Sequence, residues 1–195
     1  AKAHHFIDVH EAVFKDGFSS IVLGASDAGA ITVGGANTFT DSLALVTGNN
    51  ITLASGATIT SSQASGYLAL AATGSFINNA GASALSTASD GRWLVYSASP
   101  TSAGTNFGNL NSANAPVWGQ TYATQLPSAV AVTGNRYVFA SIPTVAVTAN
   151  SVSKTYGDVL SGTSLLGLSS SATGSTVFTL PTLTDVFSVQ PTAAS

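Results

Sequence analysis

Short apolar runs in which large side chains recur at every second position lie along the first half of the chain. They include residues 31–33, 43–45, 51–53, 68–70 and 93–95, and Gly, Asn, Ser or Thr lie close to each run. A period of two predicts β-strands, because successive side chains of a strand point to opposite faces. Glycine and β-branched residues are frequent and no 3.6-residue period persists through residues 21–96, so the pattern does not predict helices.

The strands belong to an internal repeat of about 25 residues. LALVTGNNI at 43–51 aligns with LALAATGSFI at 68–77, one repeat later, and a single extra alanine shifts the alignment by one position from Gly74 onward. The same spacing separates Gly56 from Gly81 and Gly66 from Gly91. An earlier match, of positions 30–33 with 50–53, has a shorter spacing of about 20 residues.

A repeat of this length with about three short strands predicts an all-β chain that forms a right-handed parallel β-solenoid, followed by a less regular β extension. One coil cannot bury its own apolar face and must stack on the next. A β-sandwich, the alternative, needs hairpin turns, yet the chain has Asp-Gly pairs only at 16–17 and 90–91 and no Asn-Gly pair. At the corners of the coils we expect glycines with positive φ, namely Gly48, Gly56, Gly66, Gly74 and Gly81.

The pattern divides the chain into three parts. Residues 1–20 are expected to be a capping segment that covers the edge of the first coil, and residues 21–140 to be the solenoid. An aromatic closing region begins at residue 91, and residues 141–195 are a linker and a partial Gly-rich β domain. The aromatic side chains of the closing region are Trp93, Tyr96, Phe107, Trp118, Tyr122, Tyr137 and Phe139.

These aromatic residues allow two interpretations. Trp93 and Val95 have the inward register of Leu68 and Leu70 in the previous coil, which favours a buried core that closes the solenoid. Arg92, opposite in phase, is expected to face outward. In the second interpretation the rings are exposed and stack on sugars or on a partner. The candidate contacts are then Arg92, Tyr96, Trp118 and Tyr122.

Composition excludes several functions. Lys and Arg number five and the net charge is −3, so no basic stripe exists for nucleic acid. No apolar run approaches the length of a membrane-spanning helix, and we therefore expect no membrane span. Cysteine is absent, which excludes disulfides and thiolate metal sites. Methionine is absent too, and we expect the chain to be a piece of a longer protein.

Candidate catalytic and metal-binding residues are few. The spacings between Asp27, Asp41 and Asp90 do not equal one coil, so no two of them share the register that a catalytic carboxylate pair requires. At the N-terminus are the three histidines, His4, His5 and His10, and an extended strand would put His4, Asp8 and His10 on one face. A polar capping segment explains this cluster better than a metal site. We therefore predict no enzyme activity, no catalytic residue, no metal and no cofactor.

Several longer segments resemble a known family. ITVGGANTFTDSLALVTGNNITLASGATI at 31–59, FINNAGASAL at 76–85 and GRWLVYSASP at 91–100, with the later VWGQTY and NRYVFA, resemble the C-terminal part of filamentous-haemagglutinin-like adhesins of Gram-negative bacteria. VTANSVSKTYGD at 147–158 resembles the start of the Gly-rich repeat domain, with its Tyr-Gly-Asp signature, that often follows in such adhesins. The family's Asn-Pro-Asn-Gly secretion motif is absent, and residues 160–195 diverge from the repeat.

The resemblance implies a non-enzymatic part of a secreted or surface-attached adhesin or extracellular matrix fibre. It would act in adhesion, aggregation or biofilm at the outer surface of a Gram-negative bacterium. Expected partners are neighbouring domains of a longer parent chain, further copies of the chain, or glycans and other molecules on cell surfaces. Two alternatives stay open: a self-assembling filament subunit, and a β-helix that binds or cleaves polysaccharide.

Overall fold

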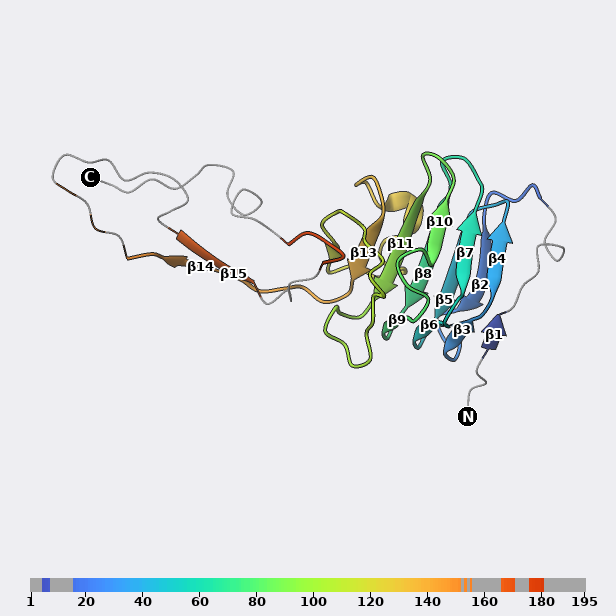
Figure 1. Ribbon diagram of the computed structural model, residues 1–195, viewed down its shortest axis with the longest axis horizontal. Helices are drawn as coiled ribbons and strands as arrows, with labels where there is room; N and C mark the ends of the chain where they lie inside the picture. The colour runs from blue at the N-terminus through green and yellow to red at the C-terminus, as the bar shows by residue number, and fades with distance from the viewer. Residues whose placement is uncertain are drawn as a thin grey trace. The chain divides into compact units, whose positions relative to one another are not determined.

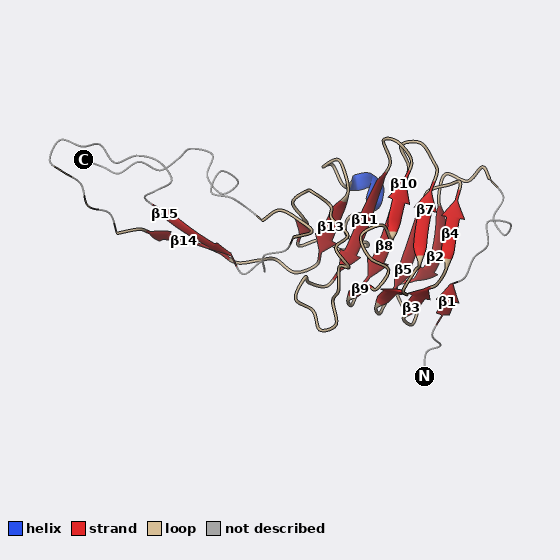
Figure 2. Ribbon diagram, viewed as in Figure 1, coloured by secondary structure: helices blue, strands red, loops and turns tan. Residues whose placement is uncertain are grey.

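The computed structural model describes residues 5–7, 16–151, 153, 155, 166–170 and 176–180 (Figure 1). The chain divides into two compact units, Ala1–Ile142 with Ser175–Thr179, and Pro143–Gly174 with Leu180–Ser195. Strands dominate the described residues of both units, and one short 3-10 turn at Pro127–Ala129 is their single helical element (Figure 2). The chain is therefore all-β, as the sequence predicts.

Three parallel sheets build the first unit, and the regular turns between β2 and β10 each contribute one strand to each sheet. Sheet A contains β1 (His5–Ile7), β3 (Ile31–Val33), β6 (Ile51–Leu53) and β9 (Phe76–Asn78). Sheet B contains β2 (Ile21–Ala25), β5 (Leu43–Thr47), β8 (Tyr67–Ala72), β11 (Arg92–Ser97), β13 (Arg136–Phe139) and β12 (Val117–Trp118). Sheet C contains β4 (Ala36–Phe39), β7 (Thr58–Ser61) and β10 (Leu85–Thr87). The prediction of a parallel β-solenoid with three strands per coil is confirmed, with about five turns (Figure 1).

The registers match the repeat read from the sequence except after Gly74, where the expected shift by one position is wrong: Ile51 pairs with Phe76 and not with Ile77. Leu43 pairs with Leu68, and Leu68 pairs with Trp93, so each coil advances by one full sequence repeat at these positions. Ile31 pairs with Ile51, which corresponds to the shorter spacing of the earlier match. Inward residues at these positions are buried, and they form a continuous apolar core that stacks like on like from coil to coil.

The glycine prediction is right in part. Gly56 and Gly81 have φ values of +77° and +99°, as expected at corners. Gly48, Gly66 and Gly74 do not have positive φ, and the expectation for these three is wrong. They are glycines because a neighbouring coil lies too close for a side chain: a Cβ on Gly48 would overlap the backbone carbonyl of Ser26.

An aromatic closing layer, made of Trp93, Phe107, Tyr137, Phe139 and Phe178, ends the core. Its rings pack edge to face or stacked, with centroids 4.8 Å apart for Phe107 and Tyr137 and 5.8 Å for Tyr137 and Phe178. The Tyr137 hydroxyl donates to the Leu110 carbonyl at 2.6 Å. Phe178 comes from far along the chain, and its segment is held by Ser112, whose backbone N–H donates to the Val177 carbonyl at 2.8 Å.

Sheet B differs from the other two sheets because both faces of its central strands are buried. Several outward positions on sheets A and C carry threonine, as at Thr32, Thr38 and Thr60. The three central strands of sheet B, β5, β8 and β11, are instead buried at nearly every residue. Residues 119–132, called the cover below, pack on their outward face through Tyr122 and Val130.

The second unit contains an antiparallel pair, β14 (Val145–Ala149) with β15 (Leu166–Ser170), in which Val147 pairs with Leu168. The Tyr-Gly-Asp motif at 156–158 lies outside the described residues. The expected boundary near residue 140 falls beside Ile142, where the continuous part of the first unit ends, and Ser175–Thr179 belongs with the first unit.

Candidate functional site

The outward face of sheet B is apolar where the cover lies on it. Ala44, Ala69 and Leu94 follow one another on adjacent strands and are fully buried. The cover contributes Val130, which is buried, and the half-buried Tyr122 to the same cluster, and Val117 of β12 packs beside them. Short side chains on β5 and β8 allow the cover to lie close to the sheet.

Arg92 fastens the cover to the sheet. The side chain lies on the outward face, as its phase predicts, and its guanidinium donates to three backbone carbonyls of the cover. The donor–acceptor distances are 2.6 Å to Val132, 2.7 Å to Pro127 and 2.9 Å to Val130. The planar, five-donor guanidinium suits this arrangement, because a lysine ammonium cannot reach three separated carbonyls in one geometry.

Replacement of Arg92 by methionine is expected to loosen the cover. It removes three charge-assisted hydrogen bonds and lowers the free energy of unfolding by about 2 kcal/mol. The measurement is amide hydrogen exchange, with a selective loss of protection over residues 120–132. Arg92→Lys, which keeps the charge, should fall between methionine and the wild type, and unchanged exchange in both variants would refute the fastening role.

Tyr96 makes a second attachment between sheet and cover. Its hydroxyl donates to the Gln125 carbonyl at 3.0 Å, and its ring lies edge-on to Tyr122, with centroids 5.6 Å apart and planes at 84°. Burial raises the pKa of Tyr96 well above the usual value, against the opposing effect of the Arg92 charge. The side chain is therefore a neutral hydrogen-bond donor at physiological pH.

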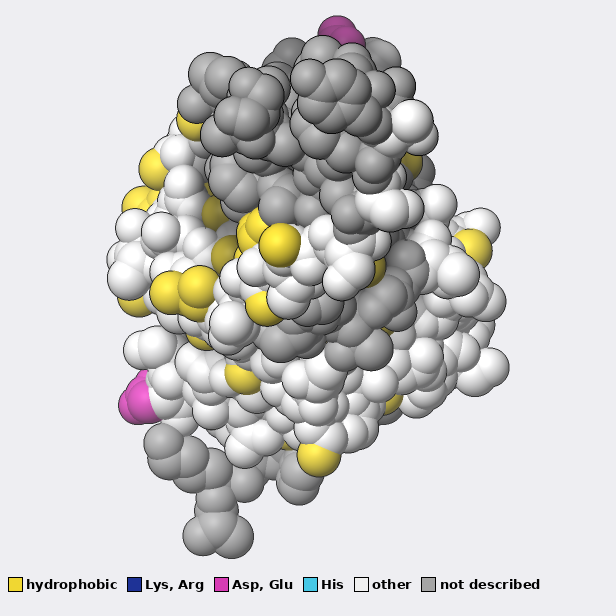
Figure 3. Space-filling view, turned by 90° about the vertical axis from the view of Figure 1, so that its left-hand side faces the viewer, with side chains coloured by type: hydrophobic (Ala, Val, Ile, Leu, Met, Phe, Trp, Pro, Cys, Tyr) yellow, Lys and Arg dark blue, Asp and Glu magenta, His cyan; other side chains and the backbone are white. Residues whose placement is uncertain are grey.

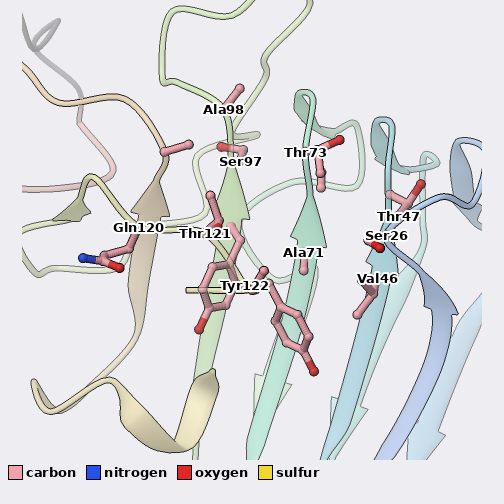
Figure 4. Close-up of a pocket in the computed structure, with 14 residues that line it drawn as sticks. Ser26, Val46, Thr47, Ala71, Thr73, Ser97, Ala98, Gln120, Thr121 and Tyr122 are labelled. Atoms are coloured by element: carbon pink, nitrogen blue, oxygen red, sulfur yellow. The ribbon is translucent and has the colours of Figure 1, made fainter. Parts of the chain in front are cut away.

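A groove remains beside Tyr122, between the edge of the cover and the ends of the sheet B strands (Figure 4). Its volume is about 200 Å³. Val46 and Ala71 lie on neighbouring strands of its floor, and Tyr122 forms a wall over them (Figure 4). The other residues that line it are Ser26, Thr47, Ala72, Thr73, Tyr96, Ser97, Ala98, Gln120, Thr121, Ala123 and Ala140.

The structure brings together three of the four candidate glycan contacts. Arg92, Tyr96 and Tyr122 all lie where the cover meets sheet B. Trp118 lies apart from them: it is half-buried on β12 and packs on Phe139, with ring centroids 5.0 Å apart. Sequence reasoning missed Val46 and Ala71, which form the floor of the groove. The sequence could have indicated them through the unbroken run of apolar residues in each of the two strands, because such a run is typical of a strand covered on both faces.

The candidate acids lie in turns. Asp27 follows β2, Asp41 precedes β5, and Asp90 precedes β11 with φ of +63°. Within the residues that the structure describes, no group of three or more His, Asp or Glu side chains is placed to hold a metal ion. His4, Asp8 and His10 lie outside the described residues, and His5 lies in β1, paired with Ile31.

In the described part of the chain no helix has the length and apolar character needed to cross a membrane. Comparisons with protein-family models, with curated protein sequences and with solved structures gave no match for this chain.

Proposed function

We propose that the chain is a non-enzymatic segment of a secreted or surface-attached bacterial adhesin or extracellular matrix fibre, and that it serves as part of the shaft. The observation that carries the proposal is the continuous stack of parallel coils. Each strand of β5, β8 and β11 is bonded to a coil on both sides, which makes a stiff element of repeating geometry. Such an element suits the task of holding a distant binding region away from a surface.

The low charge of the chain also supports an extracellular shaft. Only 7% of the residues are charged, and the described part of the face in Figure 3 shows mostly backbone and uncharged polar side chains, with scattered apolar groups and few acidic ones. Outward threonines on sheets A and C provide hydroxyl groups for hydration. Long, charge-poor β surfaces of this kind keep their properties when ionic strength and pH change around a cell.

The stack of coils is closed at one end by the aromatic closing layer. This favours a shaft segment over the alternative of a self-assembling filament subunit. End-to-end assembly requires open coil edges at both ends of each subunit. At one end of the stack Phe107, Tyr137 and Phe178 pack over the core, and residues 112–114 bond the segment around Val177. This closing layer would have to be displaced before another copy could continue the coils.

Two measurements test the proposal. Antibodies raised against the folded chain should label intact cells that produce the protein as strongly as permeabilised ones, and the purified chain should appear as single particles by electron microscopy and light scattering. Labelling that requires permeabilised cells would contradict the extracellular location. Filaments that lengthen with protein concentration would support the filament subunit instead.

A further inference from the structure

The groove beside Tyr122 exists because the outward side chains at one paired position differ in size from strand to strand of sheet B. Val46 pairs with Ala71, Ala71 with Tyr96, and Tyr96 with Val138 across neighbouring strands. On β11 the large Tyr96 fills the space under the cover. On β5 and β8 the smaller Val46 and Ala71 leave about 200 Å³ open next to Tyr122 (Figure 4).

The lining defines what can bind. None of the residues that line the groove is charged, so ions and charged ligands gain nothing there and lose hydration. The floor presents the methyl groups of Val46 and Ala71, and the wall presents the ring of Tyr122. A volume near 200 Å³ is suited to one aromatic ring, since apolar cavities of about 150 Å³ accept benzene. The groove therefore fits a neutral, mostly apolar group of ring size.

The groove is continuous with the interface between the cover and sheet B, and this indicates the kind of partner. The cover is itself an irregular polypeptide that places Tyr122 and Val130 on the outward face of sheet B, and the groove extends the same interface past the edge of the cover. A sugar would leave hydroxyls unpaired against the methyl floor. A peptide can pair its amides at the rim, where the Thr73 hydroxyl and the Gln120 amide nitrogen make no hydrogen bond within the described residues.

We propose that this groove is a docking site for a single aromatic side chain presented by an extended polypeptide partner. The ring lies on Val46 and Ala71 against Tyr122, and the partner's backbone runs across the ends of the sheet B strands. The site goes beyond the shaft role and does not depend on it, because it concerns the purified chain whatever its location.

The test is a titration of the whole chain, labelled at Ala and Val methyl groups, followed by NMR. N-acetyl-phenylalaninamide is the probe, and it should shift the methyl signals of Val46 and Ala71 in a saturable way with a Kd of about 1 mM, the affinity expected for a ligand of this size. N-acetyl-alaninamide, which lacks the ring, should cause no saturable shift. N-acetylglucosamine tests the sugar alternative with the same signals.

Two groove variants and one control variant determine where the probe binds. Ala71→Leu fills the groove and should weaken binding at least tenfold, whereas Thr60→Leu, which adds similar bulk on the outward face of sheet C, should bind as the wild type does. Tyr122→Ala removes the wall and serves as a second variant if Ala71→Leu does not fold. Absence of saturable shifts, unchanged affinity in the groove variants, or tighter binding of N-acetylglucosamine to the same methyls would overturn the proposal.

Discussion

Truncation of Tyr137 to alanine is expected to lower the free energy of unfolding by about 3 to 5 kcal/mol, the loss typical of a buried aromatic ring. Tyr137 is fully buried at the centre of the closing layer. Its ring contacts Trp93 at 5.3 Å, Phe107 at 4.8 Å and Phe178 at 5.8 Å between centroids. Its removal leaves a cavity at the end of the core, and Phe178 loses one of the three rings that it contacts.

Tyr137→Phe distinguishes the contribution of the ring to stability from that of the hydroxyl. This variant keeps the ring contacts but leaves the buried Leu110 carbonyl without its donor, which costs about 1 kcal/mol. Chemical denaturation followed by tryptophan fluorescence measures both variants, since Trp93 lies against Tyr137. Equal stabilities for the Ala and Phe variants would show that the ring does not hold the closing layer together.

Repeat spacing made the solenoid predictable from the sequence. A stack of coils repeats its local environment, so residues that align in sequence, such as Leu43 and Leu68, also pair in space. The alignment therefore gave the register and the inward direction of Trp93. The same logic fails after Ser97: Leu94 pairs with Arg136, much further along the chain than one repeat, because the long cover is inserted between the two strands.

Burial of the outward face of sheet B was not predicted. The strands were read as alternating, which implies one face in solvent, whereas Leu43–Thr47 is buried at every position. Ala44 and Val46 were apolar in the sequence, but only the distant cover decides that they are buried. Val22 pairs with Ala44 at the same outward position of the sheet and is exposed, so an apolar residue that faces outward does not by itself show that another segment covers it.

The candidate site was predictable in part of its residues but not in its shape. The sequence predicts Arg92, Tyr96 and Tyr122 as candidate contacts, and the structure brings them together. Their hydrogen bonds go to the cover: Arg92 donates to three carbonyls and Tyr96 to one. The groove depends on the contrast between Tyr96 and the smaller Ala71 beneath a segment distant in sequence, which no local motif records.

Corner glycines show how two different constraints produce the same residue type. Gly56 has φ of +77° and open space around the position of a Cβ. Gly48 has an ordinary φ, but a Cβ there would overlap the Ser26 carbonyl of the neighbouring coil, and its N–H donates to the Ala28 carbonyl at 3.2 Å. Sequence alone cannot distinguish a glycine needed for its backbone angle from one needed for close approach.

Gly48→Ala is therefore expected to be more damaging than Gly56→Ala. The added methyl at Gly48 meets backbone that can move only with its coil, and we expect a loss of about 3 kcal/mol in the free energy of unfolding. Alanine at Gly56 meets no atom and suffers only the strain of positive φ, about 1 kcal/mol. Urea denaturation of both variants under the same conditions gives the comparison. A larger loss at Gly56 would mean that backbone angle, and not the spacing between coils, selects glycine at the corners.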